Sequence, residues 1–176
     1  HGAQMKIISV IETENYAVGV MGRCASTNMI KFLSGRKIRD PWGQSFEYFN
    51  NECRKEKYLV LRDPEHRWKS AKNSGVPLDD YHALPYLRDI NFGSISGIIP
   101  FEDIPEYIGE KRFPHQKGYD LAHNKVTPPQ GLLDAEKVLY KLYRRNIPVL
   151  TPEKFKKISQ ETAMPVREKD KKKWDI

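Results

Sequence analysis

Residues 57–73 of the chain read KYLVLRDPEHRWKSAKN, and the pattern changes in the middle of this stretch. The first five residues are mostly apolar, which predicts a short buried strand. Asp63 is a residue type that accepts hydrogen bonds from the first N–H groups of a helix, and Pro64 suits the first helical position. We therefore expect a helix directly after the strand, ending at Ser74-Gly75.

Strands and helices alternate on both sides of this unit. The other expected strands are 6–11, 16–20 and 147–150. The expected helices are 26–33, 78–90, 101–111, 135–145 and 152–160. A short amphipathic stretch is expected at 46–49, and a long irregular segment at 112–131. This alternation is typical of an α/β fold, a parallel β-sheet flanked by helices in three layers. Ligands of such sheets bind beyond the carboxyl ends of the strands.

The length of 176 residues and the 39% hydrophobic content predict one domain with a real core. We expect that domain at residues 5–165. Residues 1–4 resemble the remnant of an expression tag, and residues 166–176 form a basic tail that is expected to be solvated.

Cysteine content and hydropathy suggest a compartment. Cys24 and Cys53 are too few for a disulfide scaffold, and their setting does not suggest a metal site. The chain has no run of about 18 apolar residues and no signal-peptide pattern. A cytoplasmic protein without a membrane span is the expectation.

The charge balance favours an anionic partner. The chain has 30 Lys and Arg against 23 Asp and Glu, a formal charge of +7. Nucleic acid, a nucleotide, an acidic glycan and a membrane surface all satisfy that balance. The sequence has no helix-turn-helix, zinc-finger or RNA-recognition signature, so charge alone does not select nucleic acid.

One candidate anion-binding segment is residues 21–28, MGRCASTN, between an expected strand and an expected helix. Backbone N–H groups at the start of a helix favour an anion, and Arg23, Ser26 and Thr27 add donors suited to phosphate or sulfonate. The segment is not the loop of nucleotide hydrolases, because the Gly-Lys-Ser/Thr spacing is missing. The alternative is an ordinary capped helix with an exposed arginine.

A second segment follows the strand at 57–61. Arg62 stands at the carboxyl end of that strand, and Ser70 lies in the next helix on the same face as Arg67. Arg62 and Ser70 are therefore candidates to hold a second anion. The alternative is an arginine paired with an acidic residue at a strand end, with Ser70 merely solvated.

Together the two segments resemble the cofactor motifs of sulfotransferases that use 3′-phosphoadenosine 5′-phosphosulfate. Residues 23–28 resemble the 5′-phosphosulfate loop, usually Lys/Arg-x-Gly-Thr/Ser-Thr. Residues 62–70 resemble the 3′-phosphate motif, in which a serine stands eight residues after an arginine. His123, followed by Pro128-Pro129-Gln130, is loosely similar to the His-x-x-Pro-Gln segment of the carbohydrate-type members.

This resemblance implies a P-loop-like sulfotransferase fold and transfer of a sulfuryl group to an acceptor hydroxyl or amine, with a carbohydrate expected. The implied cofactor contacts are Arg23, Cys24, Ala25, Ser26, Thr27, Asn28, Arg62 and Ser70. Arg23 would also stabilise charge on the leaving 5′-phosphate. The candidates for the general base are His123 and Glu47, with His115 and His82 behind them. No metal is implied, and the product would be the 3′,5′-bisphosphate.

One departure from the family pattern keeps other functions open. Ala25 stands where glycine is usual, and alanine resists a positive φ. A nucleotide-binding protein of this fold without catalysis is therefore an alternative, and a small basic nucleic-acid-binding protein is another. The acceptor and the oligomeric state are not encoded in any motif of the sequence.

Overall fold

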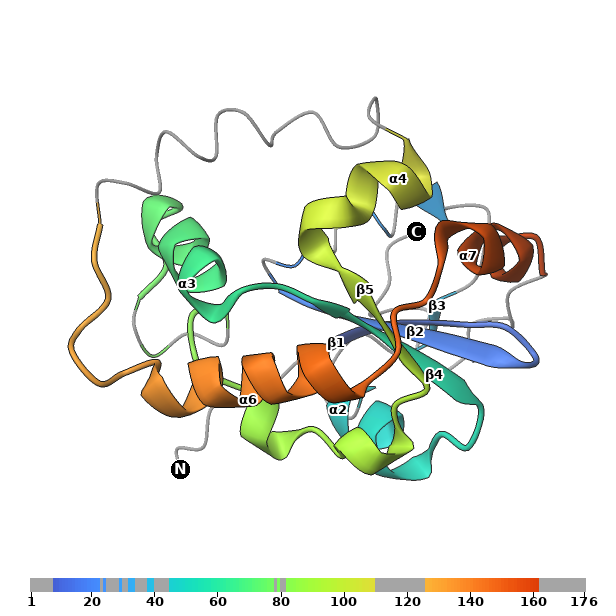
Figure 1. Cartoon of the computed structure of the whole chain (residues 1–176), viewed down its shortest axis with the longest axis horizontal. Coiled ribbons are helices and arrows are strands. Elements are labelled where there is room, and N and C mark those ends of the chain that lie inside the picture. The colour runs from blue at the N-terminus through green and yellow to red at the C-terminus, as the bar shows by residue number, and fades with distance from the viewer. Residues whose placement is uncertain are drawn as a thin grey trace.

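The computed structural model describes most of the chain between residues 8 and 161. The described residues are 8–22, 24, 29, 32–33, 38–39, 45–77, 79, 82–109 and 126–161. They form an α/β fold with helices on both faces of a single β-sheet (Figure 1). No helix of this part of the chain is long and apolar enough to cross a membrane.

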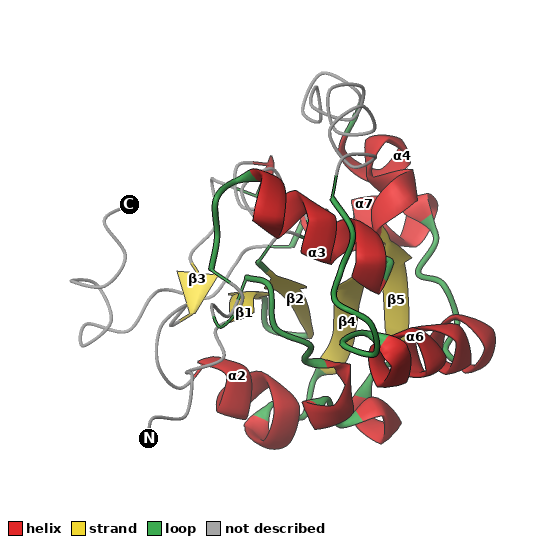
Figure 2. Cartoon of the chain, turned by 90° about the vertical axis from the view of Figure 1, so that its left-hand side faces the viewer, coloured by secondary structure: helices red, strands yellow, loops and turns green. Residues whose placement is uncertain are grey.

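The sheet has five strands in the order β3-β1-β2-β4-β5. The strands are β1 (Ile8–Glu12), β2 (Tyr16–Met21), β3 (Ile38–Arg39), β4 (Glu56–Leu61) and β5 (Gly97–Pro100). The α-helices are α2 (Ser45–Glu47), α3 (Pro64–Asn73), α4 (Ile104–Ile108), α6 (Asp134–Asn146) and α7 (Pro152–Ser159). Shorter turns are a π-helix at Tyr48–Glu52 and 3₁₀-helices at Leu87–Asp89, Phe92–Ser94 and Phe101–Asp103. Figure 2 shows α3, α4 and α7 on one face of the sheet and α2 and α6 on the other.

The first two strands correct the expectation of a parallel sheet. β1 and β2 are antiparallel and pair Ile8 with Met21 and Glu12 with Ala17. β3 is also antiparallel to β1. Only residues 13–15 connect β1 to β2, whereas parallel neighbours need a crossover of a dozen or more residues. The sheet is therefore mixed, because the connection between β1 and β2 is too short for these strands to run parallel.

The other half of the sheet is parallel, as expected. β2 pairs with β4, and β4 pairs with β5, so the carboxyl ends of three strands meet at one edge. β5 was not predicted from the sequence. The strand expected at 147–150 is reduced to one parallel bridge between Val149 and Ile98.

Helix α3 confirms the prediction made from its ends. Asp63 Oδ1 accepts hydrogen bonds from the backbone N–H groups of Glu65 (2.9 Å) and His66 (3.2 Å). The helix begins at Pro64 and ends before Gly75, whose φ of +80° suits glycine. The cap residues thus fix both ends of the element that follows β4.

The remaining helix predictions have mixed outcomes. The helices expected at 135–145 and 152–160 are confirmed as α6 and α7. The helix expected at 78–90 is wrong for the described residues, which form turns and one short 3₁₀-helix. Pro85 lies in the middle of that segment and lacks the N–H that a helix interior needs. Of the helix expected at 26–33, the described part contains one helical hydrogen bond, from Leu33 N to Met29 O (3.0 Å).

The core lies on both faces of the two central strands. Every residue of β4 after Glu56 is buried, which is typical of a parallel strand covered by helices on both sides. This run includes Lys57, whose Nζ donates a hydrogen bond of 2.6 Å to the carbonyl of Phe49. Burial lowers the pKa of the Lys57 ammonium. Cys24 and Cys53 are both buried and not joined in a disulfide.

Candidate functional site

The carboxyl ends of β2 and β4 bring the starts of the two candidate segments side by side. The register pairs Gly19 with Leu59, and three residues further along each strand stand Gly22 and Arg62. Neighbouring strands lie about 4.8 Å apart, so the start of one segment faces the start of the other. The sequence placed both segments at strand ends, and the parallel pairing of β2 with β4 makes those ends neighbours.

Arg62 and Ser70 both point inward. Arg62 is 3% exposed, and its guanidinium carbon lies 4.0 Å from the centre of the Phe101 ring. Phe101 directly follows β5, so an aromatic face from the next strand orients the arginine that ends β4. Ser70 is 2% exposed and lies on the buried side of α3.

Arg67 connects three parts of the chain at this edge. Its Nε donates a hydrogen bond of 2.9 Å to the carbonyl of Gly22, at the end of β2. Its Nη1 donates one of 2.7 Å to the carbonyl of Leu84. The guanidinium carbon also lies 4.8 Å from the centre of the Tyr86 ring. The arginine thus holds α3, the end of β2 and the segment at 84–86 together.

Cys24 lies in the same cluster. Its backbone N–H donates to the carbonyl of Met21 (3.1 Å), which closes a tight turn at the end of β2. Burial raises the pKa of the Cys24 thiol, and the positive charges of Arg67 and Arg62 offset this only in part. The thiol is therefore neutral at pH 7 and is not an activated nucleophile.

Glu136 supports the cluster from α6. Its carboxylate is buried and accepts hydrogen bonds from the backbone N–H groups of Tyr86 (2.8 Å) and Leu87 (3.1 Å). Burial raises the pKa of the Tyr86 hydroxyl well above its usual value. The segment that receives Arg67 is thus held in place from both sides.

His82 packs against the turn after β2. A Cβ atom added to Gly22 would lie 2.6 Å from His82 Cδ2, which is closer than real Cβ contacts. A larger residue at this position would force the imidazole or the turn to shift. His82 is a lesser candidate for the base in the sequence, and its position next to Gly22 is visible only in the structure.

The other expected site residues are not all gathered here. Glu47 is exposed, accepts a hydrogen bond from Asn51 Nδ2 (2.8 Å), and precedes Tyr48, whose hydroxyl donates to Glu12 at the β1–β2 turn. That turn lies at the amino end of β2, so the structure does not bring Glu47 together with Arg62. The expected site residues that lie outside the described part of the chain are Arg23, Ala25, Ser26, Thr27, Asn28, His115 and His123.

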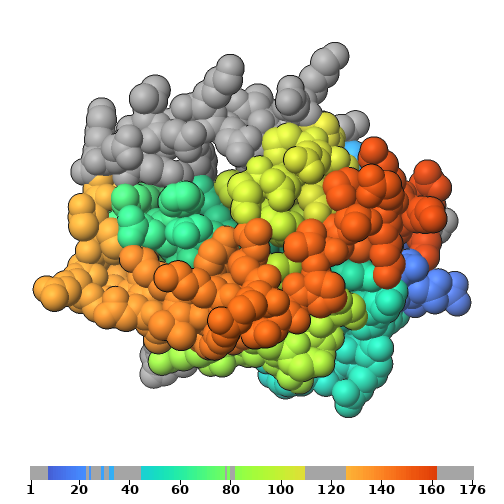
Figure 3. All heavy atoms as spheres, in the orientation of Figure 1, coloured from blue at the N-terminus to red at the C-terminus, as the bar shows by residue number. Residues whose placement is uncertain are grey.

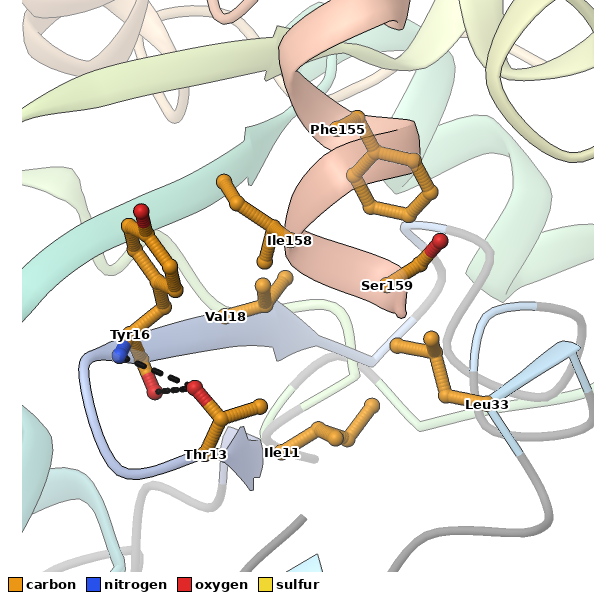
Figure 4. Close-up of a pocket in the computed structure, with 8 residues that line it drawn as sticks. All are labelled: Ile11, Thr13, Tyr16, Val18, Leu33, Phe155, Ile158 and Ser159. Atoms are coloured by element: carbon orange, nitrogen blue, oxygen red, sulfur yellow. Dashed lines mark hydrogen bonds between the residues drawn. The ribbon is translucent and has the colours of Figure 1, made fainter. Parts of the chain in front are cut away.

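Two hollows lie elsewhere on the described part of the molecule. Figure 4 shows the smaller one, lined mainly by apolar side chains of the β1–β2 hairpin and α7 together with Leu33. Its volume of about 10 Å³ leaves room for about one water molecule. It cannot take a nucleotide.

The larger hollow is an open depression of about 320 Å³ between the start of α3 and α6, whose surfaces adjoin in Figure 3. Polar side chains line it. Glu65 forms an ion pair across it with Lys137 on α6 (2.8 Å) and another within α3 with Lys69 (3.0 Å). These pairs lower the pKa of the Glu65 carboxyl to about 2.

The cluster at the strand ends contains group types that can bind an anion. Two buried guanidinium groups, a buried serine and a tight backbone turn are group types that hold phosphate or sulfonate. Among the described residues, no group of three His, Cys, Asp or Glu side chains is arranged to hold a metal ion. Comparisons with protein-family models, with curated proteins and with solved structures find no match for this chain.

Proposed function

We propose that this protein is a sulfotransferase that uses 3′-phosphoadenosine 5′-phosphosulfate. The observation that supports the proposal is that both candidate anion-binding segments start at the carboxyl ends of the adjacent parallel strands β2 and β4. A ligand with two separated anionic groups would span those ends. The resemblance of residues 23–28 and 62–70 to the two cofactor motifs of this family is the second support.

Each segment has a role in the proposed reaction. Arg62 and Ser70 would hold the 3′-phosphate. The Phe101 ring would hold the planar guanidinium of Arg62 in its orientation. Arg23 and the backbone of residues 24–28 would bind the 5′-phosphosulfate, with the hydroxyls of Ser26 and Thr27.

The transfer is a displacement at sulfur. The acceptor oxygen or nitrogen forms a bond to sulfur while the bond from sulfur to the 5′-phosphate oxygen breaks, and the acceptor proton passes to a base. The leaving group is adenosine 3′,5′-bisphosphate. His123 is the proposed base, because Glu47 lies near the amino end of β2, away from Arg62. A carbohydrate is the proposed acceptor.

The first test compares ligands by thermal stabilisation of the full chain. Adenosine 3′,5′-bisphosphate is expected to raise Tm more than ATP, 5′-AMP or short single-stranded DNA do. Arg62→Ala should abolish this preference and Ser70→Ala should weaken it, while Arg145→Ala removes an exposed arginine of α6 and serves as the control. An equal response to 5′-AMP and the bisphosphate would contradict a 3′-phosphate site. Stabilisation by DNA alone would favour a nucleic-acid-binding protein.

Turnover separates an enzyme from a binding protein of the same fold. The wild-type chain is expected to move labelled sulfate from the donor to members of a panel of hydroxylated and amino sugars. His123→Ala should keep bisphosphate binding and lose transfer, whereas Glu47→Gln should keep both, because Glu47 lies away from Arg62. Full activity in His123→Ala would remove His123 as the base. Binding without transfer by the wild type would favour the non-catalytic alternative.

A further inference from the structure

Arg67 is buried and bonded to parts of the chain that are distant in sequence. It is 3% exposed, and its guanidinium reaches Gly22, which precedes it by 45 residues, and Leu84, which follows it by 17. A buried charge is costly unless its hydrogen bonds are satisfied. These two carbonyls and the Tyr86 ring supply such partners.

The place of Arg67 in the helix is as informative as its contacts. Arg67 lies one turn before Ser70 on the buried side of α3, and the helix follows directly from Arg62. Gly22 belongs to the turn that opens residues 23–28. The bond between Arg67 and Gly22 is therefore a direct link between the two segments, made by a side chain that has no role as a ligand in the proposed function.

We infer that Arg67 is a positioning residue that fixes the separation of the 3′-phosphate segment from the 5′-phosphosulfate segment. This inference rests on the proposed function. It adds to that function by naming Arg67 as the side chain that sets the distance between the two anion sites. A ligand that carries both anions gains affinity only when both sites stand at the right separation.

The guanidinium is suited to this role in a way that an ammonium is not. Its planar fork directs Nε and Nη1 toward different acceptors, and here those acceptors lie on different segments. A lysine keeps the charge but offers a single nitrogen on a flexible stem. Arg67→Lys is therefore the informative change, and Arg67→Ala removes the charge as well.

The test measures how much the second phosphate adds to binding. The dissociation constants of adenosine 3′,5′-bisphosphate and adenosine 3′-phosphate are determined by calorimetry for wild type, Arg67→Lys, Arg67→Ala and the control Arg145→Ala. In wild type and in the control, the bisphosphate should bind at least about tenfold more tightly than the monophosphate. Arg67→Lys should lose most of that ratio while its affinity for adenosine 3′-phosphate changes by no more than about threefold.

The ratio separates positioning from general support of the fold, because destabilisation lowers Tm without changing a ratio of two affinities in the folded protein. A wild-type ratio in Arg67→Lys would overturn the inference, even if its Tm falls. An equal loss of affinity for both ligands would also overturn it. If the wild-type chain itself shows no gain from the second phosphate, the proposed function fails and this inference fails with it.

Discussion

At the scale of single residues, the imidazole of His82 occupies the space next to Gly22 where a side chain would begin. A Cβ atom at position 22 would overlap the imidazole, with a separation of 2.6 Å from Cδ2. We predict that Gly22→Ala lowers the free energy of unfolding by about 1–3 kcal/mol, because the ring and the turn must move apart. Denaturant unfolding measures this loss.

Replacing His82 tests whether its imidazole is the cause of this loss. In a His82→Ala background the same Gly22→Ala change should cost much less, because the overlap is gone. Gly93→Ala is the matched control, since the nearest atom to its added Cβ is at 3.7 Å, an ordinary contact. A cost at position 22 that does not depend on residue 82 would show that the backbone turn, not the imidazole, requires glycine.

The contacts of the candidate site show which of its features can be predicted from the sequence. Arg62 and Ser70 were identified because they belong to one strand–helix unit, where spacing along the chain determines position in space. The bond of Arg67 to Leu84 and the packing of His82 on Gly22 join segments that only the folded chain brings together. No local pattern encodes them, so Arg67 was assigned to the right helix face without its partners.

At the scale of elements, the junction of α3 with α6 contains a titrating ion pair. The hydrogen bonds and charges of Lys137 and Lys69 lower the pKa of Glu65 from 4.5 to about 2. The folded state therefore binds this proton less readily than the unfolded state does. The contribution of Glu65 to stability is complete above about pH 4.5 and is lost as the pH falls toward 2.

Glu65→Gln should therefore flatten the acid limb of the stability curve. We predict that the difference in free energy of unfolding between wild type and Glu65→Gln shrinks between pH 4.5 and pH 2, as followed by urea unfolding. Glu153→Gln is the matched control, because Glu153 also follows the proline that begins its helix but is exposed on α7. The same acid dependence in both variants would contradict the role of the lysine pairs.

The sequence predicted best the helices whose first residues are a capping residue or a proline. Asp63 and Pro64 define the start of α3, and Pro152 does the same for α7. β5 was missed because its four residues are too few for a periodic pattern, although the strand is fully buried. The antiparallel hairpin was open to prediction, since a link of residues 13–15 is too short for a crossover.

At the scale of the whole molecule, the net charge and the strand topology differ in how far they narrow the choice of ligand. The formal charge of +7 is compatible with many anionic partners. The parallel pairing of β2, β4 and β5 is more specific, because it gathers Arg62, Arg67 and Cys24 at one edge of the sheet. The location of positive charge therefore says more about the ligand than its amount.

The same edge is joined to the far helix layer by Glu136. Its carboxylate on α6 accepts from the N–H groups of Tyr86 and Leu87, while Arg67 on α3 donates to Leu84 in the same segment. Helices on opposite faces of the sheet (Figure 2) are thus connected through one short piece of chain. Oε2 accepts from both N–H groups, and Oε1 also accepts from Leu87. An amide at position 136 keeps only one acceptor oxygen, loses the negative charge that strengthens these bonds, and places an NH₂ group beside the two donors.

We predict that Glu136→Gln lowers the free energy of unfolding by about 1–3 kcal/mol, because hydrogen bonds to a buried charged acceptor become weaker neutral ones and the new NH₂ group is buried without an acceptor among these donors. Guanidinium unfolding should give a lower midpoint at an unchanged slope, because the loss acts on the whole cooperative unit. Glu106→Gln, at an exposed position of α4, is the control for charge and should leave the midpoint near wild type. A wild-type midpoint for Glu136→Gln would mean that the two N–H groups find other acceptors. A shallower slope would mean instead that α6 unfolds apart from the sheet.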